Sequence, residues 1–101
     1  MGSARLFTPA TSPWLQPSTA SAWQPLVQKA QQARARGDYE QALALLERAQ
    51  RIDPESGEIY LQMASTHQAR GDTAQAAATA ERGMLFCSNS AQCNALRAFA
   101  R

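Results

Sequence analysis

Apolar residues recur at intervals of three and four positions along most of this chain, which is the spacing of one face of an α-helix. The longest stripe runs from Tyr39 to Ile52. It stops at Asp53-Pro54, because the residue before a proline disfavours the helical conformation. The pattern predicts five helices joined by short polar turns. The first begins around residues 21–25 and ends at Gly37, the second ends at Asp53, the third at the turn of residues 71–72 and the fourth at residues 88–90, and the last covers about residues 91–100. The side chains expected to face inward are Leu26, Ala30, Ala33, Tyr39, Ala42, Leu43, Leu46, Ala49, Ile52, Ile59, Tyr60, Met63, Ala64, His67, Ala76, Ala77, Ala80, Met84, Leu85, Leu96 and Phe99.

The helices follow an internal repeat. The tetrapeptide Ala35-Arg36-Gly37-Asp38 returns unchanged as residues 69–72, an offset of 34 residues. A fixed period of this size in a helix-forming sequence predicts a stack of helical hairpins, each hairpin being one repeat. Further identities at the same offset are Ala30 with Ala64, Gln41-Ala42 with Gln75-Ala76, and Glu47-Arg48 with Glu81-Arg82.

The repeated tetrapeptide contains the signals of a helix end and a new helix start. Gly37 suits the left-handed position after a helix, and Asp38 can cap the next helix, with Gln41 completing a capping-box pattern. Ser21 and Pro25 suit the start of the first helix. Other starts are predicted at Ser56 or Gly57 and within Ser88-Asn89-Ser90.

Gly83 lies inside the fourth predicted helix, at the position that Ala49 occupies in the first repeat. Glycine inside a helix costs up to about 1 kcal/mol relative to alanine. We therefore expect Gly83 to make a helix contact too close for a side chain.

The first part of the chain differs in composition from the rest. Residues 1–20 contain Pro9, Pro13 and Pro17 among Ser, Thr and Ala, with no helical period. We interpret them as a flexible linker or arm. Its Trp14-Leu15 pair could be unstructured, pack against the helices or anchor a partner. The sequence shows no secretion signal and no apolar run long enough to span a membrane, so any lipid anchor would lie outside this fragment.

The charges argue against nucleic acid as a partner. The chain carries 10 Lys and Arg against 8 Asp and Glu, a net charge of +2 with both signs interspersed. Nucleic-acid-binding domains usually present a clustered basic face. The arginines Arg34, Arg36, Arg48, Arg51 and Arg82 are interpreted as solvated residues on helix faces.

Cys87 comes just after the fourth predicted helix, and Cys93 lies in the first turn of the fifth. A polar turn separates them. This pair favours a disulfide that clamps the terminal helix, because a metal site would require four ligands. Two free thiols and a redox role are the alternatives. A disulfide would indicate an oxidising compartment, the periplasm or the cell exterior.

The sequence offers no catalytic constellation. His67 is the single histidine, and on the inner face of a helix it is expected to be packed rather than catalytic. There is no phosphate-binding glycine loop and no convergent acid cluster. We expect a non-catalytic domain without a cofactor or a metal.

These features resemble the tetratricopeptide repeat family. Two units are similar to its signature, at about 23–56 and 57–90, with 91–100 as a C-terminal capping helix. The second unit departs at Ser88, His67 and Ala80, where the family usually has proline and larger apolar residues. The resemblance implies an all-α helical-hairpin stack over residues 21–101. The matching positions are Ala30, Gly37, Asp38, Tyr39, Ala42, Leu46, Ala49, Asp53 and Pro54, then Tyr60, Met63, Ala64, Gly71, Asp72 and Ala76.

The resemblance also implies a concave face that binds an extended peptide or a helix of another protein. In this chain that face would include Gln24, Val27, Gln31, Arg34, Leu61, Ser65 and Gln68. Chaperone adaptors of the family grip a carboxylate with Lys and Asn on this face. The corresponding positions here are Val27, Gln31, Gln62 and Gln92, which argues against such a clamp.

Three functions remain open at this stage. The first is a monomeric interaction module of the bacterial cell envelope, periplasmic and anchored to the outer membrane in the full-length protein. Its architecture and cysteine pair are similar to lipoprotein activators of bifunctional peptidoglycan synthases, which are penicillin-binding proteins. The second is a structural assembly factor for pilus or secretion machinery. The third is a cytoplasmic adaptor with free thiols.

Overall fold

The computed structural model describes residues 20–101, with side chains from Ala22 onward. This part of the chain is all-α and contains no strand. The predictions for the arm, including Trp14 and Leu15, fall on residues outside this description. Ser21 was expected to cap the first helix, but it lies inside that helix, which already includes Ala20. The elements are α1 (Ala20–Ala35), α2 (Tyr39–Ile52), α3 (Gly57–Ala69), α4 (Thr73–Gly83), the short 3₁₀ helix η4 (Met84–Phe86) and α5 (Ser90–Ala100).

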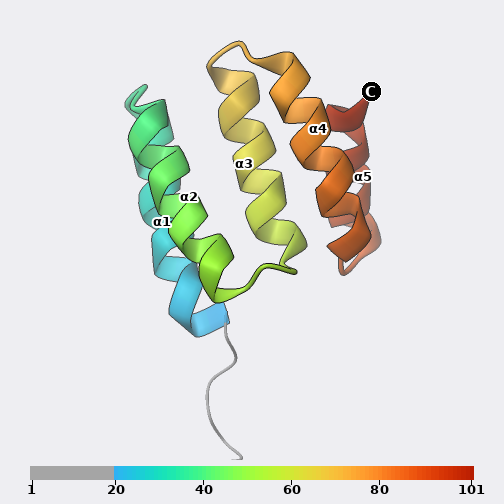
Figure 1. The fold of residues 1–101 in the computed structure, drawn as a ribbon, viewed down its shortest axis with the longest axis horizontal. Helices are drawn as coiled ribbons and strands as arrows, with labels where there is room; N and C mark the ends of the chain where they lie inside the picture. The colour runs from blue at the N-terminus through green and yellow to red at the C-terminus, as the bar shows by residue number, and fades with distance from the viewer. Residues whose placement is uncertain (1–19) are drawn as a thin grey trace, which may run out of the picture.

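The helices form the predicted stack of hairpins. Helix α1 pairs with α2, α3 pairs with α4, and α5 packs against both helices of the second hairpin (Figure 1). Helix α3 also contacts α1 and α2, so the two hairpins lie side by side. The first helix of each hairpin and α5 therefore follow one another along one face of the stack.

Both copies of the repeated tetrapeptide form the same turn. Gly37 has a φ of 82°, a left-handed conformation that glycine adopts without strain. The N–H of Gly37 donates to the Arg34 carbonyl at 2.9 Å, and the N–H of Asp38 donates to the Ala33 carbonyl at 2.8 Å. The Asp38 side chain caps α2 by accepting from the Gln41 N–H at 3.2 Å. The second turn repeats these bonds with Gly71, Gln68, Asp72, His67 and Gln75.

This turn changes one detail of the predicted capping box. That motif requires the side chain of Gln41 to bind the N–H of Asp38. The N–H of Asp38 is already engaged by the Ala33 carbonyl, in the bond that ends α1. Only the Asp38 half of the capping box therefore forms. The acceptor for the Asp38 N–H is the Ala33 carbonyl of the preceding helix, in place of the Gln41 side chain.

Two apolar clusters fill the stack, and α3 contributes to both. Ile59 and Met63 of α3 pack into the first cluster, between the hairpins, whereas Tyr60 and Ala64 pack into the second. The first cluster contains Trp23, Val27, Ala30, Ala33, Ala42, Leu45, Leu46, Ala49, Ile59 and Met63. The second contains Tyr60, Ala64, Ala80 and Leu96, bordered by Leu61, Met84, Phe86, Cys87, Phe99 and Ala100.

Two predicted inward positions, Ile52 and Leu85, are exposed, and one buried position, Leu45, was not predicted. Leu45 is buried in α2 where Leu43 was expected, because the buried face runs through positions 42, 45, 46 and 49 and leaves 43 at its edge. Ile52 is 41% exposed at the last residue of α2. Leu85 is 78% exposed, because the chain tightens into η4 there and rotates the side chain out of the α-helical register.

Gly83 makes the close contact that the sequence predicts. A β-carbon at this position would overlap the Cβ of Tyr60 and lie 3.1 Å from Cδ2 of Leu96. Helices α3, α4 and α5 therefore meet at a point where a hydrogen atom is the largest group that fits.

Candidate functional site

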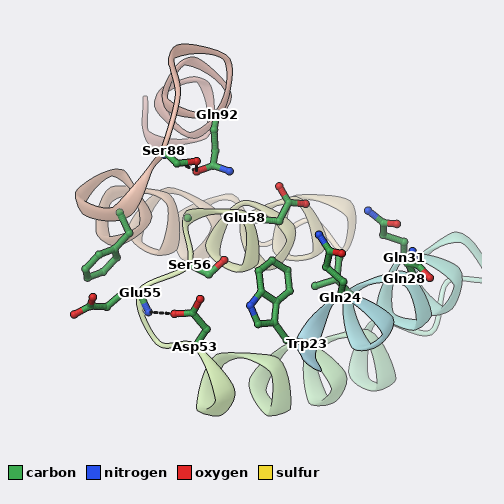
Figure 2. A pocket seen from close by; sticks show the side chains of 13 residues that line it. Trp23, Gln24, Gln28, Gln31, Asp53, Glu55, Ser56, Glu58, Ser88 and Gln92 are labelled. Atoms are coloured by element: carbon green, nitrogen blue, oxygen red, sulfur yellow. Dashed lines mark hydrogen bonds between the residues drawn. The ribbon is translucent and has the colours of Figure 1, made fainter. Parts of the chain in front are cut away.

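A groove of about 620 Å³ opens along the face formed by α1, α3 and the start of α5. Helix α1 forms one wall, the α2–α3 connection and the first turn of α3 form the floor and end, and the η4–α5 connection forms the opposite wall (Figure 2). The lining residues are Trp23, Gln24, Val27, Gln28, Gln31, Asp53, Glu55, Ser56, Gly57, Glu58, Phe86, Ser88 and Gln92.

The α1 wall is a row of amides. Gln24, Gln28 and Gln31 follow one another at helical spacing and are exposed, so they lie on the same face of α1. Figure 2 shows their side chains directed away from the helix along the groove. Each glutamine amide both donates and accepts hydrogen bonds, which suits contact with peptide groups.

Three carboxylates are among the lining residues of the groove. Asp53, Glu55 and Glu58 line it, and none of the lining residues is Lys, Arg or His. Oδ1 of Asp53 accepts from the N–H of Glu55 at 3.2 Å, and Oε2 of Glu58 accepts from Nε2 of Gln62 at 3.0 Å. The groove is therefore locally negative in a chain whose net charge is +2.

Trp23 forms the base of the α1 wall and belongs to the first apolar cluster. It is 5% exposed, and its Nε1 is buried without a hydrogen-bond partner. Figure 2 shows the nitrogen-bearing edge of the indole turned toward Asp53. A buried donor without an acceptor costs about 1–3 kcal/mol.

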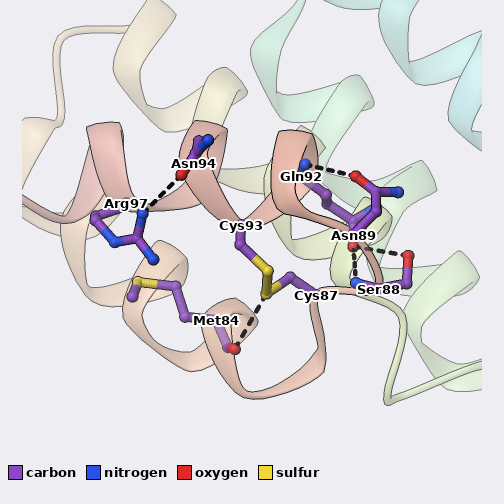
Figure 3. Close-up of a disulfide and its surroundings, with 8 residues drawn as sticks. All are labelled: Met84, Cys87, Ser88, Asn89, Gln92, Cys93, Asn94 and Arg97. Atoms are coloured by element: carbon purple, nitrogen blue, oxygen red, sulfur yellow. Dashed lines mark hydrogen bonds between the residues drawn. A yellow bond between two sulfur atoms is a disulfide. The ribbon is translucent and has the colours of Figure 1, made fainter.

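The opposite wall is built on a disulfide. Cys87 follows η4, Cys93 lies in the first turn of α5, and the bond joins them with a Cα–Cα distance of 5.2 Å (Figure 3). Inside this loop, Oε1 of Gln92 accepts from the N–H of Ser88 at 2.9 Å. Oδ1 of Asn89 accepts from the N–H of Gln92 at 2.8 Å and caps α5.

The start of α3 approaches this loop closely. A β-carbon on Gly57 would lie 2.8 Å from the carbonyl oxygen of Phe86 and 2.9 Å from Cα of Cys87, and would overlap Oε1 of Gln92. Glycine at this position lets the disulfide loop rest against the helix that forms the floor. The start of α3 and the opposite wall of the groove are therefore in close contact.

The groove includes three of the seven residues expected on the concave face. Gln24 and Gln31 are exposed in it, whereas Val27 is 5% exposed and packs in the first cluster beneath them. Val27 therefore offers a partner little surface. The other four, Arg34, Leu61, Ser65 and Gln68, lie outside the groove lining, with Leu61 packed against the second cluster.

Arg34 donates hydrogen bonds to residues of α3 within the domain. Its Nη1 donates to Oε1 of Gln62 at 3.1 Å, to the Gln62 carbonyl at 3.3 Å and to Oγ1 of Thr66 at 3.2 Å. Partial burial lowers the pKa of its guanidinium from the usual value. Arg34 thus ties α1 to α3, and this role was not expected from the sequence.

Most of the residues that line the groove were not predicted from the sequence. Gln28 could have been found, because it completes the helical spacing between Gln24 and Gln31. Asp53 was interpreted only as the end of a helix, and Glu55 was not singled out. Nothing in the sequence places Phe86, Ser88 or Gln92 opposite α1, since that depends on how the second hairpin and α5 stack.

His67 is buried on α3, as the sequence predicts, and its Nδ1 has no hydrogen-bond partner. Burial lowers the pKa of the imidazole, and the positive charge of Arg70 lowers it further. Asp72 and Glu47 act in the opposite direction with smaller effects.

This lowered pKa predicts a pH-dependent stability. As the pH falls below about 6.5, the unfolded chain binds a proton at His67 before the folded chain does. The free energy of unfolding should therefore fall with falling pH, by at most about 1.4 kcal/mol per pH unit, until the folded pKa is passed. Urea unfolding at pH 7.5, 6.5 and 5.5 measures this slope. The variant His67→Gln should show a shallower slope, and an equal slope would contradict the prediction.

Within residues 20–101, no group of three His, Cys, Asp or Glu side chains is placed to hold a metal ion. In the same part of the chain, no helix is long and apolar enough to cross a membrane.

Comparison with known protein families identifies the fold. The family model described as "Tetratricopeptide repeat" matches residues 33–98 of the 101-residue chain, from the end of α1 into α5. The chain belongs to the tetratricopeptide repeat family. No curated protein and no solved structure matches it.

Tetratricopeptide repeats are typically non-catalytic modules for protein–protein interaction. Another protein is therefore the kind of partner that the family indicates. The disulfide of this tetratricopeptide repeat domain favours an oxidising compartment.

Proposed function

We propose that the groove between α1, α3 and α5 binds an extended segment of another protein. The observation that carries this proposal is the row of exposed glutamine amides on α1, which faces a second polar wall across the groove. Such a row can exchange hydrogen bonds with a peptide backbone without demanding a particular side chain. The apolar residues beneath it are already buried in the domain, so the groove offers polar contact rather than an apolar socket.

The proposed setting is the bacterial cell envelope, with a periplasmic domain that a lipid anchor outside this stretch holds at the outer membrane. Two features support this setting: the Cys87–Cys93 disulfide, and the similarity of the architecture to lipoprotein activators of peptidoglycan synthases. The proposed partner is a bifunctional peptidoglycan synthase. Activation would follow from tighter binding to the active conformation of the enzyme than to the inactive one.

Binding to a purified soluble form of such a synthase tests this proposal. We expect the triple variant Gln24→Ala, Gln28→Ala and Gln31→Ala to raise the Kd about tenfold, and to lower the stimulation of glycan synthesis accordingly. The matched control is Gln41→Ala with Gln75→Ala, two exposed glutamines on α2 and α4, outside the groove lining.

Each result discriminates between the parts of the proposal. Failure of the synthase to bind would reject that partner. Binding that the groove variants leave unchanged would reject the groove. Two free thiols in the protein isolated from cells would reject the envelope setting and favour a cytoplasmic adaptor.

A further inference from the structure

The groove begins where the chain enters the domain. Residues 1–19 precede α1, whose first residue is Ala20. Trp23 and Gln24, one helical turn later, already line the groove, and the row of amides continues from there along α1. The preceding chain is therefore held beside one end of the groove before any partner arrives.

This preceding chain is long enough to turn back and follow the groove. Gln24 and Gln31 are separated by about 10 Å along α1, at about 1.5 Å per residue. Residues 9–15 can extend over about 22 Å, at about 3.1 Å per residue in the extended conformation that proline favours. Residues 16–19 remain for the reversal, and Pro17 suits the second position of a reverse turn.

The composition of residues 9–13 fits the row of amides. Their sequence is Pro-Ala-Thr-Ser-Pro, with small side chains throughout. Each proline contributes a carbonyl acceptor but no N–H, whereas each glutamine amide on α1 carries two N–H donors. A proline-containing extended segment also loses little conformational freedom when it binds. Such a segment is therefore suited to accept hydrogen bonds from the glutamines.

The next two residues would reach the end of the groove formed by the start of α3. A chain that reverses at residues 16–19 and runs along α1 places Trp14 and Leu15 near the first turn of that helix. Phe86 lines the groove, is half-buried, and its carbonyl oxygen approaches Gly57 at the start of α3. Contact with Phe86 would remove apolar surface of Trp14 and Leu15 from water.

Charge does not oppose this occupant. Residues 1–19 contain Arg5 and no Asp or Glu. The groove lining contains carboxylates and no Lys, Arg or His. No like charges are therefore brought together when this segment enters the groove.

We propose that residues 9–15 of this chain occupy its own groove, with residues 9–13 along the amides of α1 and with Trp14 and Leu15 beside Phe86. A tethered segment has an effective concentration on the order of millimolar, so a weak contact is enough to fill the groove. The segment is then a competitor that a partner must displace. This inference rests on the proposed function of the groove and adds the regulation of access to it.

NMR of the full chain labelled with ¹³C and ¹⁵N tests the contact directly. An NOE is expected between the ring protons of Trp14 and those of Phe86. The double variant Trp14→Ser and Leu15→Ser should abolish it, and should shift the side-chain amide signals of the α1 row. The side-chain amides of Gln41 and Gln75, on α2 and α4 outside the groove lining, should stay in place.

A peptide supplied in trans tests the competition. The probe is a synthetic peptide of residues 8–16 with blocked ends, and its control is a peptide of the same composition in scrambled order. The probe should bind the Trp14→Ser and Leu15→Ser chain about fivefold more tightly than the unmodified chain, whose groove is already occupied. The scrambled peptide should bind both chains more weakly than the probe.

The contrary results are distinct from failure of the proposed function. Equal affinity of the probe for the two chains, no binding of the probe, or groove signals that the double variant leaves unmoved would each overturn this inference. If the glutamine variants weakened synthase binding while the double variant left it unchanged, the groove would stand and its internal competitor would not. If the probe bound but the synthase did not, the competitor would stand and that partner would not.

Discussion

Replacing Gly83 with leucine is expected to lower the free energy of unfolding by about 3 kcal/mol, the upper part of the range for overpacked cores. A side chain here would overlap Cβ of Tyr60 and lie 3.1 Å from Leu96. Cβ of Tyr60 is fixed to the α3 backbone, so the helices themselves must move apart. Urea unfolding followed by circular dichroism measures the loss. Ala78→Leu, at an exposed position of the same helix, is the control and should change stability by less than about 0.5 kcal/mol.

Gly83→Ala separates the contact from helix propensity. Propensity alone predicts that alanine stabilises the helix by up to about 1 kcal/mol. The overlap with Tyr60 predicts a loss of about 1–3 kcal/mol, which exceeds that gain. A more stable Gly83→Ala variant would show that α3 and α4 are not in the close contact described above.

Removing the disulfide is expected to have the second largest effect. The double variant Cys87→Ser and Cys93→Ser should lose about 2 kcal/mol, because the bond closes a short loop that the unfolded chain would otherwise sample freely. In a domain of this size that is a large share of the total stability. Denaturant unfolding of the oxidised protein, the reduced protein and the double variant measures it.

The reduced protein is the control for the double variant, since both lack only the bond. Their midpoints should agree with each other and lie below that of the oxidised protein. Equal midpoints for the oxidised and reduced forms would contradict the prediction. Because Ser88 and Gln92 lie inside the closed loop, the same samples should also bind the partner more weakly.

The features that the sequence predicts well are local in the chain. The turn at Gly37-Asp38 and its copy at residues 71–72 depend on neighbouring residues, so both the left-handed glycine and the aspartate cap were predictable. The close approach at Gly83 followed from its offset to Ala49. The repeat itself is read from the fixed period, and the family match agrees with it.

The features that the sequence did not predict depend on stacking. Asp53 and Glu55 line the groove because the α2–α3 connection lies beside Trp23, and the opposite wall arises because the disulfide loop rests on Gly57. Arg34 was expected to face a partner, but α3 presents Gln62 and Thr66 to it. Such contacts join segments about 30 residues apart, and no local pattern encodes them.

Helix α3 has a consequence for how the domain comes apart. Since Ile59 and Met63 face one apolar cluster while Tyr60 and Ala64 face the other, neither hairpin can open without baring one side of this shared helix. The two repeats should therefore melt together in one transition, and the backbone amides of α3 should be the last to exchange with deuterated solvent.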